Sequence, residues 1–363
     1  MKKEHRVYKK RGSGKLRRVC TVAALGVCCV ILTVFSDTAS AAVSRALSVC
    51  AERLLPSLFP YMVVSSLLVS SGAADAISRR LPAARLFGLP GEASSAVILG
   101  LLCGFPLGAK TAAELYERGT VGKKEAEALI SVSNNTGPSF VVSVIGAAFW
   151  KNAAFGWWLY AAQSVFGIAA GIIVNRVIYK LPSVGNSYRT LRATGDKKSS
   201  SVFVDAVRGA VRASLSVCGF VMTFAVIIDY IKSVLGNRGI VCAAAASVLE
   251  ITEGARLSAA LAADGSRLGG FFCGFALGFS GLSVIFQAYS FCAPQSLSLR
   301  RTVAVKLLQG IFCGCAGYAL TYFYTSPAVP AAAAPAPAAA PYVVCAAVMC
   351  AFFLKSVLKA YKM

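Results

Sequence analysis

The sequence contains little charge and almost no histidine. Of its 363 residues only 14% are charged, 57% are hydrophobic and one is histidine, whereas a soluble domain has about 25% charged residues. The mean hydropathy is +0.67. This composition excludes a soluble enzyme, a disordered chain and a fibrous protein. Acidic residues are especially scarce, because 15 Asp and Glu stand against 37 Lys and Arg, which leaves a net charge of +22.

Patterns for catalysis and metal binding are also missing. With one histidine and no CxxC pair among 13 cysteines, the sequence offers no Cys/His zinc site. The cysteines lie in apolar runs, where we expect them to act as small apolar fillers. The sequence has no GxxxxGK[ST] phosphate-binding motif and no Ser/His or other nucleophile–base arrangement. We therefore expect no enzyme, catalytic residue, metal site or bound cofactor.

What the sequence has instead is a series of long apolar runs, each long enough, or nearly so, to cross a hydrocarbon core of about 30 Å. They occupy residues 19–35, 47–72, 94–113, 126–149, 153–177, 206–231, 239–263, 268–292, 303–324 and 342–358. They lack two-residue alternation, so we predict helices rather than barrel strands. Residues 1–41 also resemble a secretory signal peptide, but the length of the first apolar run favours an uncleaved helix.

The basic residues predict how these runs cross the membrane. If all ten crossed, the five Lys and Arg of residues 180–205 would lie outside, against the positive-inside rule. Treating 94–113 and 239–263 as re-entrant hairpins places the basic loops and both tails inside. We therefore predict an all-α polytopic membrane protein with about eight transmembrane helices plus two re-entrant hairpins. The charge excess then reflects topology, and we expect a lipid bilayer rather than nucleic acid as the partner.

The two hairpin regions resemble each other in sequence. Residues 108–110 (Gly-Ala-Lys) recur as 254–256 (Gly-Ala-Arg), and 136–139 (Thr-Gly-Pro-Ser) recur as 280–283 (Ser-Gly-Leu-Ser). Each hairpin precedes a helix that a polar, glycine-containing patch interrupts, and the two halves begin on opposite sides. Such an inverted repeat with interrupted helices is typical of secondary transporters, whose site lies near the membrane midplane.

This interpretation divides the chain into seven segments. They are a basic cytoplasmic tail (1–18), a first helix and loop (19–46), a first repeat (47–178), a basic cytoplasmic loop (179–205), a second repeat with the following helix (206–325), an Ala/Pro spacer loop (326–341), and a last helix with a basic tail (342–363).

Polar residues inside the apolar runs are the candidates for a substrate site. In the first repeat they are Asn134, Asn135, Thr136 and Ser139. A proline after a glycine makes a continuous helix improbable there, so we predict a break that lines a wet cavity. The alternative is that these side chains only join helices through hydrogen bonds. In the second repeat the corresponding candidates are Ser280, Ser283 and Gln287.

Charged residues in the hairpins are the second set of candidates. Glu250 and Glu253 lie three apart and share a helix face. They are predicted to couple or gate transport, through a proton or a sodium ion, unless they are merely solvated at the interface. Lys110 and Arg256 occupy equivalent places in the repeats and would favour an anionic substrate. The alternative is that both reach to their respective surfaces.

Five motifs in this order resemble the sporulation integral membrane protein family (YlbJ type), whose members carry nucleoside-recognition, or Gate, domains. The motifs lie at residues 54–60, 104–111, 133–138, 249–254 and 281–284. The resemblance covers residues 47–309. The sequence departs from the family pattern at Phe286, which precedes Gln287, and in the Ala/Pro loop with the last helix.

This resemblance implies a role in endospore-forming bacteria, where members are associated with spore maturation and with moving dipicolinic acid across the outer forespore membrane. Gate domains are also similar to the core of concentrative nucleoside transporters. We therefore expect a secondary transporter of a small anionic metabolite in the cell membrane or the outer forespore membrane. A nucleoside-type transporter and a non-transporting spore-envelope protein remain as alternatives. A second copy or other sporulation membrane proteins are further candidate partners.

Overall fold

The computed structural model describes residues 19–70 (apart from 24), 76, 78, 80–181, 199–235 and 239–324. Every regular element within these residues is helical, as the apolar runs predict, and none is a strand. Residues 1–18, most of the basic loop, the Ala/Pro spacer and the predicted last helix lie outside the described residues.

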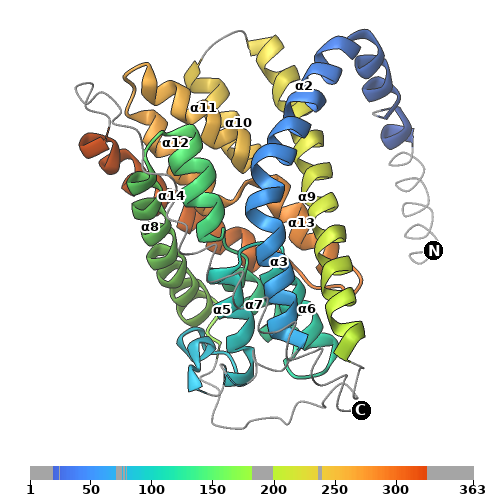
Figure 1. Cartoon of the computed structure of the whole chain (residues 1–363), viewed down its shortest axis with the longest axis vertical. Coiled ribbons are helices and arrows are strands. Elements are labelled where there is room, and N and C mark those ends of the chain that lie inside the picture. Colours follow the sequence, from blue (N-terminus) through green and yellow to red (C-terminus); the bar gives the residue numbers. More distant parts are fainter. Residues whose placement is uncertain are drawn as a thin grey trace, which may run out of the picture.

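Short helices outnumber long ones in the bundle (Figure 1). The α-helices are α2 (Ser36–Val49), α3 (Leu55–Ser70), α5 (Ser94–Leu102), α6 (Leu107–Glu117), α7 (Lys123–Ser133), α8 (Ala153–Ile172), α9 (Ser199–Leu235), α10 (Gly239–Leu249), α11 (Ile251–Ala263), α12 (Leu268–Phe279), α13 (Gly281–Cys292) and α14 (Arg300–Tyr324). Wider π-helical turns form η1 (Cys50–Leu54), η4 (Phe140–Phe149) and η5 (Ile173–Ile178), and 3₁₀ turns form η2 (Ala83–Phe87) and η3 (Gly91–Ala93).

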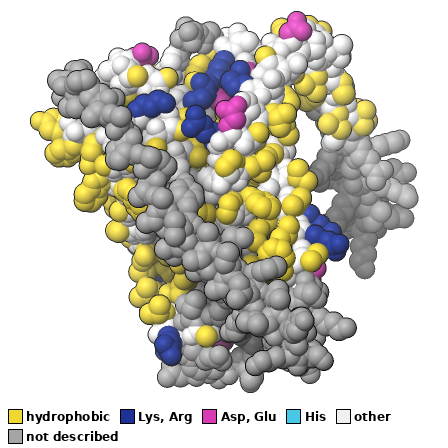
Figure 2. Space-filling view, viewed as in Figure 1, with side chains coloured by type: hydrophobic (Ala, Val, Ile, Leu, Met, Phe, Trp, Pro, Cys, Tyr) yellow, Lys and Arg dark blue, Asp and Glu magenta, His cyan; other side chains and the backbone are white. Residues whose placement is uncertain are grey.

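Five stretches are long and apolar enough to cross a membrane. They are Ser36–Leu68, Ala153–Ile178, Val202–Leu235, Leu268–Cys292 and Arg300–Tyr324. The first begins eleven residues before the predicted apolar run at 47, because helix α2 extends through a more polar segment that contains four alanines. Figure 2 shows hydrophobic side chains over the middle of the visible face and a cluster of acidic and basic groups near its upper end.

Two pairs of helices fold back on themselves where hairpins were predicted. Helices α5 and α6 pack against each other, and the chain reverses between them at Gly104, whose φ of 79° suits glycine. Helices α10 and α11 pack in the same way and meet at Glu250. In Figure 1 the first pair lies at one end of the bundle and the second pair at the other. This arrangement agrees with repeats of opposite orientation, while the depth of either pair in a membrane stays a prediction.

Two helices are interrupted where polar patches were predicted. Helix α7 ends at Ser133, and the helical path resumes at Phe140 in η4. Helices α12 and α13 are separated by Ser280 alone, which has a left-handed backbone with φ 70°. In both cases the interruption exposes backbone groups that a continuous helix would have paired internally.

Glycines let α12 and α14 form the most extensive helix contact. A Cβ atom added at Gly274 would lie 2.1 Å from the Cys313 carbonyl oxygen, and one added at Gly270 would lie 2.3 Å from the Gly317 carbonyl oxygen. Small residues at such spacing allow membrane helices to approach backbone to backbone. This contact places α14, and the polar side chains it carries, directly against the second broken helix.

Candidate functional site

The first hairpin encloses the first break. Cβ atoms added at Gly100 in α5 and Gly108 in α6 would lie 1.8 Å and 1.9 Å from the Ser133 carbonyl oxygen. At the tip, a Cβ added at Gly104 would lie 2.5 Å from the Gly137 backbone nitrogen. Both arms and the tip of the hairpin therefore touch the interrupted helix.

The predicted residues of this break are deeply buried. Asn134, Asn135 and Thr136 are at most 2% exposed. Both side-chain amide atoms of Asn134 and the hydroxyl of Thr136 have no hydrogen-bond partner. Ser139 instead donates to the Ser57 carbonyl oxygen in α3 at 3.0 Å. The break thus holds polar groups that α7 and its neighbours leave unpaired.

The second hairpin meets the second break in a similar way. Glu250 stands between α10 and α11, and its carboxylate accepts a hydrogen bond from the Glu253 backbone N–H at 2.8 Å, capping α11. A Cβ added at Gly281 would lie 3.1 Å from the Glu250 Cα. On the interrupted helix, the hydroxyl of Ser280 is buried without a partner. Gln287 donates weakly to Ser283 at 3.4 Å, and its amide oxygen is unpaired.

The two halves meet at a small closed cavity. Three groups of residues line it. The first half contributes Phe105 at its hairpin tip and Phe140 in η4, and the second half contributes Glu250, Ile251 and Thr252 at its hairpin tip with Val284 and Gln287 in α13. Two long helical stretches complete the lining with Leu54, Leu58, Val217 and Val221. The space between these atoms is about 230 Å³, of which only about 10 Å³ is open to the centre of a water molecule. That is room for about one water, so a larger solute requires the hairpin tips to separate.

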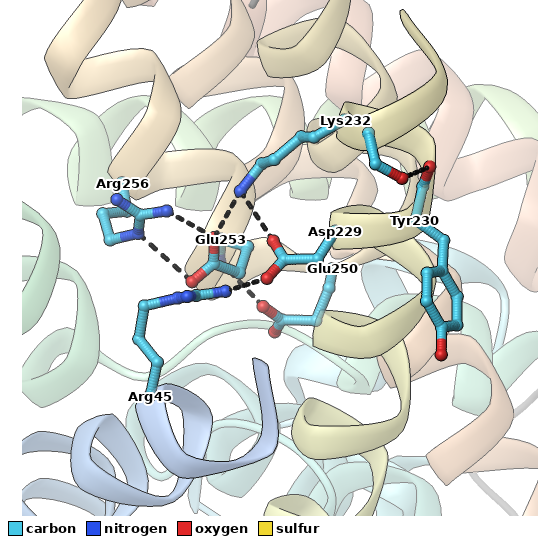
Figure 3. A network of polar contacts seen from close by, with 8 residues as sticks. Arg45, Asp229, Tyr230, Lys232, Glu250, Glu253 and Arg256 are labelled. Carbon is cyan, nitrogen blue, oxygen red and sulfur yellow. Dashed lines mark hydrogen bonds and ion pairs between the residues drawn. The ribbon is translucent and has the colours of Figure 1, made fainter. Parts of the chain in front are cut away.

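An ion-pair network covers one end of this arrangement (Figure 3). The Glu253 carboxylate accepts from Arg256 at 2.7 Å and 3.1 Å, and lies 3.6 Å from the Lys232 ammonium. Lys232 also contacts Asp229 at 3.1 Å, and Asp229 pairs with Arg45. We call these five residues the outer ion network; it links α11, α9 and α2. Three of its members were missed in the sequence, although Asp229 was visible as an acid inside an apolar run.

The structure does not bring Lys110 and Arg256 together. Arg256 is engaged by Glu253, whereas Lys110 lies on α6, toward the other end of the bundle (Figure 1). The Lys110 ammonium is 3.8 Å from Glu114, and its side chain is 37% exposed. As the helices are arranged here, each cation has its own carboxylate and neither lines the cavity.

A further polar cluster beside the first break joins the predicted Asn135 and Thr136 to three residues that were missed in the sequence, Lys306, Gln309 and Gln163. The Lys306 ammonium in α14 donates to the Asn135 amide oxygen at 2.9 Å and to the Gln309 amide oxygen at 3.0 Å. From α8, Gln163 donates to the Thr136 carbonyl oxygen at 2.8 Å. Lys306 is 1% exposed. A lysine inside the predicted span 303–324 was the available signal.

The described residues contain no group of three or more His, Cys, Asp or Glu side chains that could hold a metal ion. The candidate site therefore consists of amides, hydroxyls, backbone groups and single charges. Amides and hydroxyls of this kind are hydrogen-bond donors and acceptors.

Comparison with known proteins finds a family model and a relative that are similar to this chain. Residues 51–151 match the family model described as Gate, nucleoside recognition. This range contains the first hairpin and the first break. The chain is also 27% identical over 302 residues to the sporulation integral membrane protein YlbJ of Bacillus subtilis, with 73% of each chain covered. The resemblance inferred from the sequence motifs is thereby confirmed.

Among solved structures there is no significant match. The five apolar helices and the similarity to an integral membrane protein agree with the composition: the chain is a multi-pass integral membrane protein. Sporulation is the process named for its relative, and nucleoside recognition is the description of the matched Gate model.

Proposed function

We propose that this protein is a secondary transporter of a small anionic metabolite during spore formation, with dipicolinate as the first solute to test. The observation that carries the proposal is the meeting of two hairpins from opposite ends with two interrupted helices at one closed cavity. Interrupted helices and a site at the interface of inverted repeats are the elements of alternating access.

The unpaired polar groups support a solute site at the breaks. A buried polar group without a partner costs about 1–3 kcal/mol, and Asn134, Thr136, Ser280 and Gln287 all carry such atoms. A polar solute that entered between the hairpin tips would supply the missing partners. The same groups would discriminate against apolar solutes, since these would leave them unpaired.

The two glutamates take different parts in this proposal. Glu250 lines the cavity and touches the second break, which suits a coupling group that responds to the solute. Glu253 holds Arg256 and Lys232 in the outer ion network, which suits a gate, because α11 cannot move away from α9 without separating Glu253 from Lys232. The driving force comes from a gradient, and a proton or a sodium ion at Glu250 is the proposed coupling ion.

The orientation follows from charge. The end of η5 at Ile178 and the start of α9 at Ser199, which the basic loop connects in sequence, lie at the end of the bundle opposite the outer ion network (Figure 1). The basic residues of this loop place that end in the cytoplasm by the positive-inside rule. The outer ion network then faces the other compartment, whether the membrane is the cell membrane or the outer forespore membrane.

Uptake into vesicles tests the proposal. Purified protein in liposomes should accumulate labelled dipicolinate when a proton or solute gradient is imposed, and Asn134→Ala should abolish accumulation. Asn152→Ala is the matched control, since this asparagine caps α8 by accepting from Phe155 N–H at 3.1 Å and lies away from both breaks. Absence of uptake by the wild-type protein, or equal uptake by the two variants, would refute the site.

A nucleoside is the second candidate solute, because the matched family model is described by nucleoside recognition. Competition by uridine or adenosine in the same vesicles would identify it. If the protein transports neither class, yet its deletion blocks sporulation while Glu250→Gln and Glu253→Gln do not, a non-transporting role in the spore envelope is the better account.

A further inference from the structure

Lys306 is a buried lysine that pairs with no acidic side chain among the described residues. It lies in α14 at 1% exposure, and among the described residues no carboxylate lies within ion-pair distance of its ammonium. An unpaired charge in a protein interior is costly unless polar groups solvate it. Here the solvating groups are two amide oxygens, one from Asn135 in the first break and one from Gln309.

The hydrogen bonds around Lys306 fix the direction of both amides. The NH₂ group of Asn135 donates to the Val132 carbonyl oxygen at 2.8 Å, and that of Gln309 donates to the Gln163 carbonyl oxygen at 2.9 Å. Each amide therefore turns its oxygen toward Lys306. Since the atoms that contact the ammonium are acceptors, the site is built for a donor-only cation.

Oxygen atoms of amides at a helix break are the ligands that hard monovalent and divalent cations also use. In this chain the cation is covalently attached to α14 and cannot leave. Lys306 and its two amide ligands are absent from the cavity lining. The Lys306 ammonium therefore stabilises the break and does not contact a solute in that cavity. The nearby Gly167 of α8 allows the close approach, because a Cβ there would lie 2.6 Å from the Gln309 amide nitrogen.

We propose that the Lys306 ammonium is the built-in cation of the first break, tying Asn135 to α14, and that this break binds no sodium ion. The role of this break in transport rests on the proposed function above, whereas cation occupancy can be tested without it. Lys306 is a positioning residue: it acts on a solute through Asn135 and the adjoining Asn134.

Chemical rescue tests the assignment. Lys306→Ala removes three methylenes and the ammonium, a space that n-propylammonium fits. In choline chloride its thermal unfolding midpoint should lie below that of the wild-type protein, and it should rise with n-propylammonium concentration as mass action requires. Val305→Ala is the matched control: it opens a buried space beside Lys306 that has no amide ligands, and the amine should leave its midpoint unchanged. Lys306→Met fills the space without charge and should not be rescued.

Three results would overturn the proposal. One is a Lys306→Ala protein that folds and gains nothing from n-propylammonium. Another is an equal gain in Val305→Ala. The third is saturable stabilisation of the wild-type protein by sodium over choline that Asn135→Ala removes, which also decides the matter if Lys306→Ala does not fold.

A transport arm separates this inference from the proposed function. Where dipicolinate uptake is observed, replacing sodium by choline should not change its rate in the wild-type protein, and a sodium requirement that disappears in Asn135→Ala counts against the built-in cation. Where no uptake is observed under any gradient, the proposed function fails, and the rescue measurements still decide the role of Lys306.

Discussion

The contact between the first hairpin tip and the first break can be tested with a single methyl group. Gly104 has a left-handed backbone with φ 79°, and an added Cβ would meet the Gly137 nitrogen at 2.5 Å. Gly119 has a similar φ of 69° but nothing within 4 Å of an added Cβ. Changing each to alanine therefore imposes the same backbone strain, while only Gly104→Ala forces two backbones apart.

The expected loss of stability has two contributions, the backbone strain and, for Gly104→Ala alone, the cost of overpacking. A left-handed conformation costs an L-residue about 1–2 kcal/mol, which is the whole effect expected for Gly119→Ala. Overpacking adds about 1–3 kcal/mol, so Gly104→Ala should lose about 2–5 kcal/mol in total. We expect its thermal unfolding midpoint in detergent to fall clearly below that of Gly119→Ala.

The same pair of variants links stability to function. Because the displaced backbone belongs to the break itself, Gly104→Ala should also reduce solute uptake per folded molecule, while Gly119→Ala should not. Equal midpoints for the two variants would show that the hairpin tip does not touch the break, and would refute the geometry on which the site rests.

Two further changes probe other contacts. Gly274→Ala in α12 should destabilise the protein by at least about 1–3 kcal/mol because its Cβ would strike the Cys313 carbonyl oxygen, whereas Gly219→Ala, with nothing within 4 Å, should not; similar thermal midpoints would contradict the close helix contact. Glu253→Gln should cost about 1–3 kcal/mol, because it leaves the partly buried Arg256 without a carboxylate and removes one of the two carboxylates that Lys232 contacts. Glu114→Gln, which weakens only half-exposed pairs, should cost less than about 1 kcal/mol, and a larger midpoint loss in this control would argue against the burial described.

Local chemistry explains why the interruptions could be located in advance. Glycine and proline at 104–108 and 137–138 act on the backbone of their own segment, and the structure reverses or breaks the chain at these places. The helix ends were harder to predict, because an apolar run marks the part of a helix that faces the membrane and not the full hydrogen-bonded length of that helix. Thus the first long stretch begins at Ser36 rather than at residue 47.

The partners of the charged residues could not be predicted in this way. Lys110 and Arg256 stand at matching places in the repeats, and the sequence suggested one shared anion site. The helices α6 and α11 carry them toward opposite ends (Figure 1), where Lys110 pairs with Glu114 and Arg256 pairs with Glu253 (Figure 3). Each acid was close in sequence, three or four positions away, but only the packed helices show that these pairs persist and that the cavity lies elsewhere.

By itself, the sequence determined that this is a helical membrane protein with two interrupted helices and two chain reversals, since hydropathy, the backbone limits of glycine and proline, and the placement of basic residues can all be read along the chain. The tertiary structure decided which buried groups meet. Lys306 and Asn135 are separated by 171 residues along the chain and joined at 2.9 Å. No periodicity or spacing encodes such a contact, because it exists only after the helices α7 and α14 have packed side by side.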